Sequence, residues 1–285
     1  MKVEFLFPAL KSLRTLLVLK SFSFEDLTLL SHLTSLRILD LIYTDIKKLP
    51  KEVEKLIHLR YLDLSRTDVE ELPEVVSNLS NLQTLRLNWC SYLRRLPNGI
   101  GKLVSLRHLE AEESGFEELP ETINSLSNLQ TLKLNWCRDL RRLPYEIGKM
   151  VGLRHLEAEW TKLEEVPETV GNLSNLQTLK VNYCHQLQKL TNDIGKMVSL
   201  RQLEVECTKL EELPETVGIG KLRDLQTLTK FVVDEEVSDI GELKDLNNLR
   251  HLTLIFNNDD DEAVKSVLEL LEPHPNLNHI LTWRS

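Results

Sequence analysis

Aromatic residues recur in this sequence at a fixed place in a 23- or 24-residue pattern, which is typical of a binding surface. Trp89, Trp136 and Trp160 are three of the four tryptophans, and each follows the last apolar residue of a repeated phrase by two positions. Large amphipathic rings often dominate the binding energy of protein interfaces. We call this set of equivalent positions the aromatic column; its members are Tyr43, Arg66, Trp89, Glu113, Trp136, Trp160, Tyr183 and Cys207.

The aromatic column predicts partner contacts by Tyr43, Trp89, Trp136, Trp160 and Tyr183. We expect strand alternation to point these side chains away from the interior of each repeat. An alternative interpretation is an aromatic edge stacked on neighbouring arginine or asparagine side chains. Replacing Trp136 and Trp160 together separates the two, because only the first predicts weaker partner binding.

A charged column lies between the second and third apolar positions of the same phrase. Its members are Asp40, Asp63, Arg86, Glu110, Lys133, Glu157, Lys180 and Glu204. The sign alternates from Asp63 onward, and each opposite-charge pair across neighbouring strands contributes about 0.2–1 kcal/mol. The charges of this column either neutralise one another across the strands or contact a partner. The two interpretations are compatible. In the second case the contact residues are Arg86, Glu110, Lys133, Glu157, Lys180 and Glu204.

The cysteines and histidines do not form a chemical centre. Cys90, Cys137 and Cys184 share a turn position that is threonine or serine in other repeats, so we predict buried structural thiols. Cys207 is the cysteine to test for reactivity. No histidine cluster has the spacing of a metal site, and no nucleophile motif occurs.

Two glycine-rich stretches are not phosphate loops. Gly99-Ile100-Gly101-Lys102 and Gly218-Ile219-Gly220-Lys221 lack the spacing of that motif, and leucine follows each lysine. The sequence therefore predicts no catalytic residue, no cofactor and no metal, and a protein that is not an enzyme.

The elements that position these columns are set by the phrase L-x-x-L-x-L. It begins at eight places, the last apolar position sometimes being alanine or valine: Leu36, Leu59, Leu82, Leu106, Leu129, Leu153, Leu176 and Leu200. Alternating leucines predict a short strand, and a proline in the second half of most units excludes a continuous helix. One unit cannot bury its own apolar face, but stacked units can.

This pattern predicts an α/β leucine-rich-repeat solenoid, a curved horseshoe of about 12 repeats. A parallel β-sheet would line its concave face, and short helical, 3-10 or loop return segments its convex face. We expect one domain over 1–285, with a degenerate N-terminal repeat or cap at 1–35 and regular repeats at 36–224. Irregular repeats would fill 225–285, with one helix at about 260–272.

Composition narrows the class of partner. Leucine accounts for 60 of 285 residues, and the formal net charge is −9. An acidic surface cannot release counterions from nucleic acid, so we expect no nucleic-acid partner. No apolar run reaches 18 residues and no signal-peptide pattern follows Met1, so we expect no membrane insertion and a cytoplasmic location.

Several phrases together resemble the leucine-rich-repeat domain of plant nucleotide-binding leucine-rich-repeat immune receptors, in particular the coiled-coil class. They are LRYLDLSRTDVEELPE, NLQTLRLNWCSYLRRLPNGIGKLVSLRHL and LQTLTKFVV, followed by GELKDLNNLRHL and LLEPHPNLNHI. The resemblance covers nearly the whole chain, although the nucleotide-binding domain of such receptors is missing from it.

The resemblance implies a defence role. The domain would sense a pathogen effector or a guarded host protein, and would contact the nucleotide-binding domain of the same receptor near the N-terminal repeats, holding that domain inactive. The alternative is a free-standing intracellular scaffold or adaptor in signalling. An upstream coding segment with a phosphate loop favours the first hypothesis, and a true start at Met1 favours the second.

Overall fold

The computed structural model describes residues 11–18, 27–210, 218–233, 240–256, 261–271, 274 and 276–284. It divides into two compact units, Met1–Pro144 and Tyr145–Ser285. Parts of the predicted cap at 1–35 and of the repeats at 36–224 lie outside the described residues. The prediction of a single domain over 1–285 stays a prediction.

The described residues of the first unit form six three-residue strands that alternate with 3-10 helices (η). In chain order the described elements are β1 (Thr15–Leu17), η2 (Leu27–His32), β2 (Ile38–Asp40), η3 (Lys51–Lys55), β3 (Tyr61–Asp63), η4 (Glu74–Asn78), β4 (Thr84–Arg86), η5 (Ile100–Lys102), β5 (His108–Glu110), η6 (Glu121–Ser125) and β6 (Thr131–Lys133). Each strand pairs in parallel with the next along the chain.

The second unit follows the same plan and then changes. Its described elements are η7 (Ile147–Lys149), β7 (His155–Glu157), η8 (Glu168–Asn172), β8 (Thr178–Lys180), η9 (Ile194–Lys196), β9 (Gln202–Glu204), η10 (Ile219–Lys221), β10 (Thr227–Val233), α2 (Ile240–Leu243), β11 (His251–Phe256), α3 (Asp261–Leu271) and β12 (His279–Arg284). All neighbouring strands are again parallel. The last three strands are longer, and α3 lies where the sequence predicts a helix.

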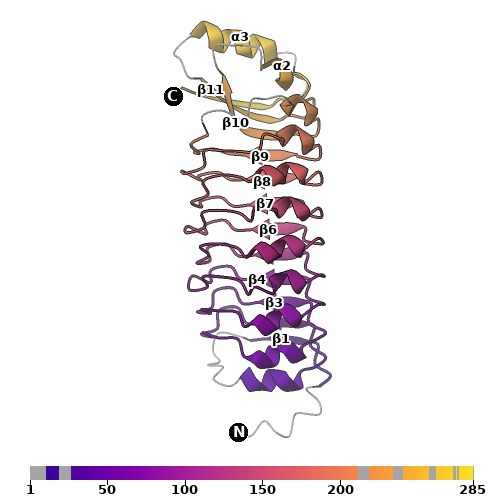
Figure 1. Ribbon diagram of the computed structural model, residues 1–285. Coiled ribbons are helices and arrows are strands. Elements are labelled where there is room, and N and C mark those ends of the chain that lie inside the picture. Colours follow the sequence, from indigo (N-terminus) through magenta and orange to yellow (C-terminus); the bar gives the residue numbers. More distant parts are fainter. Residues whose placement is uncertain are drawn as a thin grey trace. The chain divides into compact units, whose positions relative to one another are not determined.

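The predicted repeat architecture is confirmed: each repeat contributes one strand of a parallel sheet and one return segment (Figure 1). The leucines of the phrase form the core. Leu82, Leu85 and Leu87, for example, are 0 % exposed, whereas Thr84 and Arg86 between them are half-buried. We call the side of each unit's sheet that carries Thr84, Arg86 and their equivalents the open face.

From η4 to η9 the return segments alternate between two lengths, because the sequence alternates there between two local signals. Five-residue 3-10 helices follow a proline, such as Pro73 or Pro120, whose extended backbone precedes the helix. Three-residue helices carry Ile-Gly-Lys instead. A Cβ at Gly148 would overlap the carbonyl oxygen of Thr169, so glycine allows the two kinds of segment to pack closely.

An asparagine before the first leucine of several repeats joins neighbouring turns. The Asn81 side-chain amide donates to the carbonyl of Ile57 at 2.8 Å, and Asn128 donates to Val104 at 2.8 Å. Asn175 repeats the contact in the second unit. Such hydrogen bonds contribute about 0.5–1.5 kcal/mol each, and their repetition fixes the spacing of successive turns.

The pattern breaks at β10. The register with β11 shifts between Leu228 and Phe231, which is a β-bulge. Lys230 occupies the place of a core leucine there and is 8 % exposed. Its ammonium donates to the carbonyl of Leu210 at 2.6 Å, and burial lowers the pKa of the Lys230 amine.

Candidate functional site

The aromatic column adopts a left-handed backbone throughout. The φ angles lie between 52° and 65° at Tyr43, Arg66, Trp89, Glu113, Trp136, Trp160, Tyr183 and Cys207. This conformation costs about 1–2 kcal/mol for a residue with a Cβ. The Trp89 N–H still donates to the Glu112 carbonyl at 2.7 Å, so the turn continues the hydrogen-bond ladder beyond the strand.

Tyr43, Trp89 and Trp160 are exposed, whereas Trp136 and Tyr183 are half-buried, and the predicted reason for the exposure is wrong. Strict alternation from Leu85 and Leu87 would place Trp89 on the core side. Strand β4 ends at Arg86, however, and the left-handed turn carries the ring outward. Trp89 is 47 % exposed and Trp160 is 36 % exposed. A backbone turn, rather than pleating, therefore presents these rings.

In the first unit, rings of the aromatic column stack on an arginine guanidinium. The guanidinium carbon of Arg66 lies 5.0 Å from the ring centroid of Tyr43 and 4.5 Å from that of Trp89. Cation–π contacts of exposed groups contribute about 0.5–1 kcal/mol each. This is the arginine stacking that the sequence left open as an alternative, and it fixes the two rings before any partner arrives.

Trp136 borders a shallow hollow in the first unit. The guanidinium carbon of Arg138 lies 5.4 Å from the Trp136 ring centroid. The hollow has a volume of about 250 Å³ and is also lined by Glu113 and Asp139. An indole beside both signs of charge offers apolar area and polar contacts at one place.

In the second unit the column is held by ring stacking. The rings of Trp160 and Tyr183 are parallel with centroids 4.2 Å apart. His185 meets both rings edge-on, with centroids 6.1 and 6.4 Å away. Such pairs contribute about 0.5–1.5 kcal/mol beyond their buried area.

The charged column forms opposite-charge pairs across strands within each unit. Arg86 Nε lies 3.1 Å from a Glu110 oxygen, and Lys180 Nζ lies 3.0 Å from a Glu204 oxygen. Asp63 is buried and accepts hydrogen bonds from the Ser65 N–H and the Tyr61 hydroxyl. The charged residues are thus at least partly self-neutralised, and their partner-binding role stays a prediction.

Tyr61 completes the polar contacts around Asp63. Burial, followed by the hydrogen bond to Asp63, raises the pKa of the Tyr61 hydroxyl to about 12. The hydroxyl therefore stays protonated and donates to Asp63 at neutral pH. Arg86 donates to the same hydroxyl at 3.3 Å, which links β3 to β4 on the open face.

Sequence reasoning missed a third column, two residues past the charged one. Its members are Ile42, Ser65, Asn88, Glu112, Asn135, Glu159, Asn182 and Glu206. Asparagine and glutamate alternate and bond to one another: Asn135 donates to Glu112 at 2.8 Å and Asn182 to Glu159 at 2.6 Å. The alternation could have been found in the sequence by extending the strand spacing by two residues.

Carboxylates outnumber cations where this third column meets the charged one on β7–β9. Burial, followed by the charges of Glu204 and Glu159, raises the pKa of Glu206. Burial also raises the pKa of Glu159; the hydrogen bond from Asn182 opposes the shift and Glu204 adds to it. Both shifts arise mainly from burial of the carboxylates, to which the neighbouring negative charges add.

The cysteines at the turn position are buried hydrogen-bond donors. The thiols of Cys90, Cys137 and Cys184 each lie 3.1 Å from a carbonyl of the preceding repeat. Burial raises the pKa to about 11 for Cys90 and about 12 for Cys137, so both remain neutral. Cys207 is exposed and free; its reactivity stays a prediction.

His108 and His155 contact the neighbouring strand of the sheet. His108 and His155 each lie within 3.2 Å of a threonine hydroxyl on the next strand. Among the described residues, no group of three or more histidine, cysteine or acidic side chains is placed to hold a metal ion.

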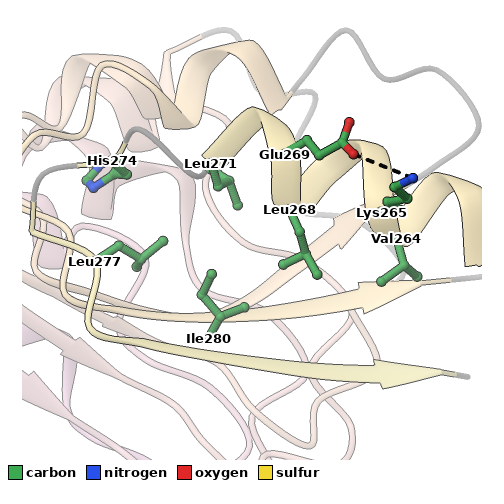
Figure 2. Close-up of a pocket in the computed structure, with 8 residues that line it drawn as sticks. All are labelled: Val264, Lys265, Leu268, Glu269, Leu271, His274, Leu277 and Ile280. Atoms are coloured by element: carbon green, nitrogen blue, oxygen red, sulfur yellow. Dashed lines mark ion pairs between the residues drawn. The ribbon is translucent and has the colours of Figure 1, made fainter.

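A groove lies between α3 and the last strand. Figure 2 shows Val264, Leu268 and Leu271 of the α3 region above Ile280 of β12, with Leu277 and His274 at one end. Its volume is about 510 Å³. Both ring nitrogens of His274 are buried, and neither has a hydrogen-bond partner among the described residues. The core of this last repeat is therefore less completely covered than that of the regular repeats.

A family model described as a leucine-rich repeat region matches residues 2–114 and 145–285. The chain belongs to the leucine-rich-repeat family. Leucine-rich-repeat domains are generally non-catalytic scaffolds for protein interaction, and the open face with its ordered columns has the corresponding architecture. A separate comparison with curated proteins finds no match to this chain.

Solved structures share the fold. A leucine-rich-repeat protein of Leptospira interrogans is 27 % identical with a TM-score of 0.72, covering 88 % of this chain and 62 % of its own. An internalin of Listeria monocytogenes is 18 % identical with a TM-score of 0.61, covering 90 % and 76 %. A plant peptide hormone receptor, solved with the peptide RGF2, is 23 % identical with a TM-score of 0.51, covering 88 % and 48 %.

The leucine-rich-repeat chain is shorter than the proteins whose structures it resembles. It spans about 62 % of the Leptospira protein and about half of the plant receptor. Within the part of the chain that the structure describes, no helix is both long and apolar enough to cross a membrane.

Proposed function

We propose that the open face recognises protein partners as the sensing and autoinhibitory leucine-rich-repeat region of a plant intracellular immune receptor. The family match supports a protein-interaction domain. The alternating cysteine and threonine turns and the Phe-Val-Val stretch support the plant receptor class through the resemblance described above. The domain is non-catalytic and cytoplasmic in this proposal.

One observation carries the recognition role: bulky aromatic residues occupy backbone positions that disfavour them. Asparagine or glycine would adopt the left-handed turn at lower cost, yet five of the eight positions are tryptophan or tyrosine. Strain of this kind is typical of residues kept for function. The stacked rings are also ordered in advance, which reduces the entropy lost on binding.

The test is partner recovery from plant extract with a variant that keeps the turns. Trp89→Asn with Trp160→Asn removes both rings and leaves residues that tolerate a positive φ. Tyr145→Asn is the matched control, because Tyr145 is a 66 % exposed aromatic in a return segment. We expect partners captured by the native chain and the control to fall at least tenfold with the double variant.

Equal recovery by all three proteins would remove the open face as the recognition site. The receptor role has its own test: the coding sequence upstream of Met1. A phosphate-loop motif there is expected, and a stop codon in frame would favour the free-standing scaffold instead.

A further inference from the structure

In the first unit, one position of the aromatic column places an acidic side chain between two tryptophans. Glu113 follows Trp89 by 24 residues and precedes Trp136 by 23, so the three occupy equivalent left-handed turns of successive repeats. The Glu113 N–H donates to the Asn135 carbonyl at 2.8 Å, which joins its turn to that of Trp136. A carboxylate and two indoles therefore belong to adjacent turns, about 4.8 Å apart along the sheet.

A missing side chain opens a hollow beside Glu113. Gly115 stands where the neighbouring repeats carry Ser91 and Arg138, and a Cβ at this glycine would overlap the Ser91 carbonyl oxygen. Glycine therefore allows the turns to pack, and it leaves the hollow of about 250 Å³ that Glu113 and Trp136 line. A space of that size holds several waters or the head group of one partner side chain.

The charges that line the hollow leave the Glu113 carboxylate without a partner among the described residues. Asp139 forms an ion pair with Arg94 at 3.8 Å, and the Arg138 guanidinium carbon lies 5.4 Å from the Trp136 ring centroid. Within the described part of the chain, neither arginine forms an ion pair or a hydrogen bond with Glu113. This half-buried carboxylate can therefore accept charge-assisted hydrogen bonds from a cation that another molecule supplies.

The first unit itself shows which kind of group fits between neighbouring rings of the column. The Arg66 guanidinium carbon lies 5.0 Å from the Tyr43 ring centroid and 4.5 Å from that of Trp89. Arg66 belongs to the repeat before Trp89, and Glu113 belongs to the repeat after it. On one side of the indole the chain supplies a cation, and on the other it supplies an anion. The complementary cation on that second side has to come from a partner.

A guanidinium suits this site better than an ammonium. It is planar and stacks on an indole, and its fork of N–H groups binds a carboxylate in a bidentate manner. A lysine ammonium is a strongly hydrated point charge and gains less from an aromatic face. The same pairing already occurs on this surface, because Arg66 and Arg138 each lie over a tryptophan of the column.

We propose that the turns of Trp89, Glu113 and Trp136 form a binding site for an exposed arginine of a partner protein. The guanidinium stacks on the Trp89 ring, donates to the Glu113 carboxylate and fills the hollow beside Trp136. The inference rests on the recognition role proposed above, and it names the partner group that this part of the aromatic column takes.

The probe is a short Gly-Ser peptide, blocked at both ends, with one central arginine. Two matched peptides carry citrulline, which keeps the shape without the charge, or lysine, which keeps the charge without the planar group. The chain has four tryptophans, so their indole N–H signals can be followed by NMR, and Trp89→Asn assigns the signal of Trp89. We expect the arginine peptide to shift that signal with a Kd of about 1–10 mM. The lysine peptide should bind about threefold more weakly, and the citrulline peptide about tenfold more weakly.

Protein variants locate the contact. Glu113→Gln removes the charge, and Glu113→Arg fills the site with a guanidinium in a kind of turn that already accepts Arg66. Both variants are expected to weaken the arginine peptide about tenfold. Glu54→Gln is the matched control, because Glu54 is an exposed glutamate of η3 in the same unit, and it should leave the affinity unchanged. Thermal unfolding of each variant checks that the fold is retained.

Four outcomes overturn the inference: equal binding of the arginine and citrulline peptides, equal binding of the arginine and lysine peptides, unchanged binding by both Glu113 variants, or shifts confined to tryptophans other than Trp89 and Trp136. The citrulline comparison keeps the test decisive even if a protein variant unfolds. If the arginine peptide fails while partner recovery still depends on Trp89 and Trp160, the recognition role stands and only this partner group falls.

Discussion

Strands β7–β9 and β10–β12 belong to one unit and one sheet, yet the side chains on their open face differ in chemistry. On β7–β9 the open face is polar and internally paired, as in Lys180 with Glu204 and Asn182 with Glu159. On β10–β12 the face includes Val232, Ile255 and Trp283 in register, and Trp283 is more than half exposed. The two sets of strands therefore differ in the chemistry of this face, with polar and charged side chains beside β7–β9 and these three apolar side chains in register on β10–β12.

The largest difference between the two regions is expected in the stability lost when a core side chain is truncated. Leu179 in β8 is 0 % exposed, whereas Ile280 in β12 is 37 % exposed. Truncation to alanine is expected to cost about 2–5 kcal/mol at Leu179 and about 1 kcal/mol at Ile280. Urea unfolding of both variants measures this; equal losses would show that the last repeat is packed as tightly as the regular ones.

The second largest difference is expected in the stability lost when the tryptophans of the two regions are replaced. Trp160→Ala loses the stack on Tyr183 and keeps a Cβ in the left-handed turn, so we expect a loss of about 1 kcal/mol. Trp160→Asn should be more stable than Trp160→Ala by roughly 1 kcal/mol, because asparagine tolerates that turn. Trp283→Ala should stay within about 0.5 kcal/mol of the native chain.

Calorimetric melting of the three variants tests the tryptophan comparison. If the asparagine and alanine variants at Trp160 melt together, the left-handed turn stores no strain and the argument from strain to function loses its basis.

The smallest effect concerns pH and the carboxylates of β7–β9. A folded-state pKa above the ordinary value of about 4.3 means that the folded chain binds the proton more tightly. Stability gained by protonating Glu159 and Glu206 is present at low pH and is lost as pH rises through their raised folded pKa. The charges of Glu157, Glu204 and Lys180 face the same groups, so the shift is collective.

Glu159→Gln with Glu206→Gln should therefore raise the Tm at neutral pH, and the difference from the native chain should disappear below about pH 4. A lower Tm of the double variant at neutral pH would contradict this prediction, since that result would mean that the charged carboxylates stabilise the fold. Glu112→Gln in the first unit is a useful comparison, because Glu112 belongs to the same column as Glu159 and accepts from Asn135 as Glu159 accepts from Asn182.

Much of the site could be predicted from spacing alone, because equivalent residues of stacked repeats must form columns. The charged pair Lys180–Glu204 followed directly from a separation of 24 residues. The column of Asn88, Glu112 and their equivalents was not predicted, because a polar residue directly after the last apolar one is ordinary in a turn and its pairing depends on the neighbouring repeat. The burial of Lys230 could not be predicted from the sequence. A charge at a core position is explained only by the β-bulge and by the carbonyl that accepts from its ammonium.

By itself the sequence determined the repeat, the parallel strands and the proline-initiated return segments, because leucine period and proline chemistry act locally. Only the tertiary structure decided how the aromatic rings are presented and what they contact. Their left-handed turns depend on hydrogen bonds to the next repeat, such as Trp160 N–H to the Asn182 carbonyl. Whether a ring stacks on Arg66 or on Tyr183 depends on the neighbouring strand, a contact that exists only once the repeats are stacked.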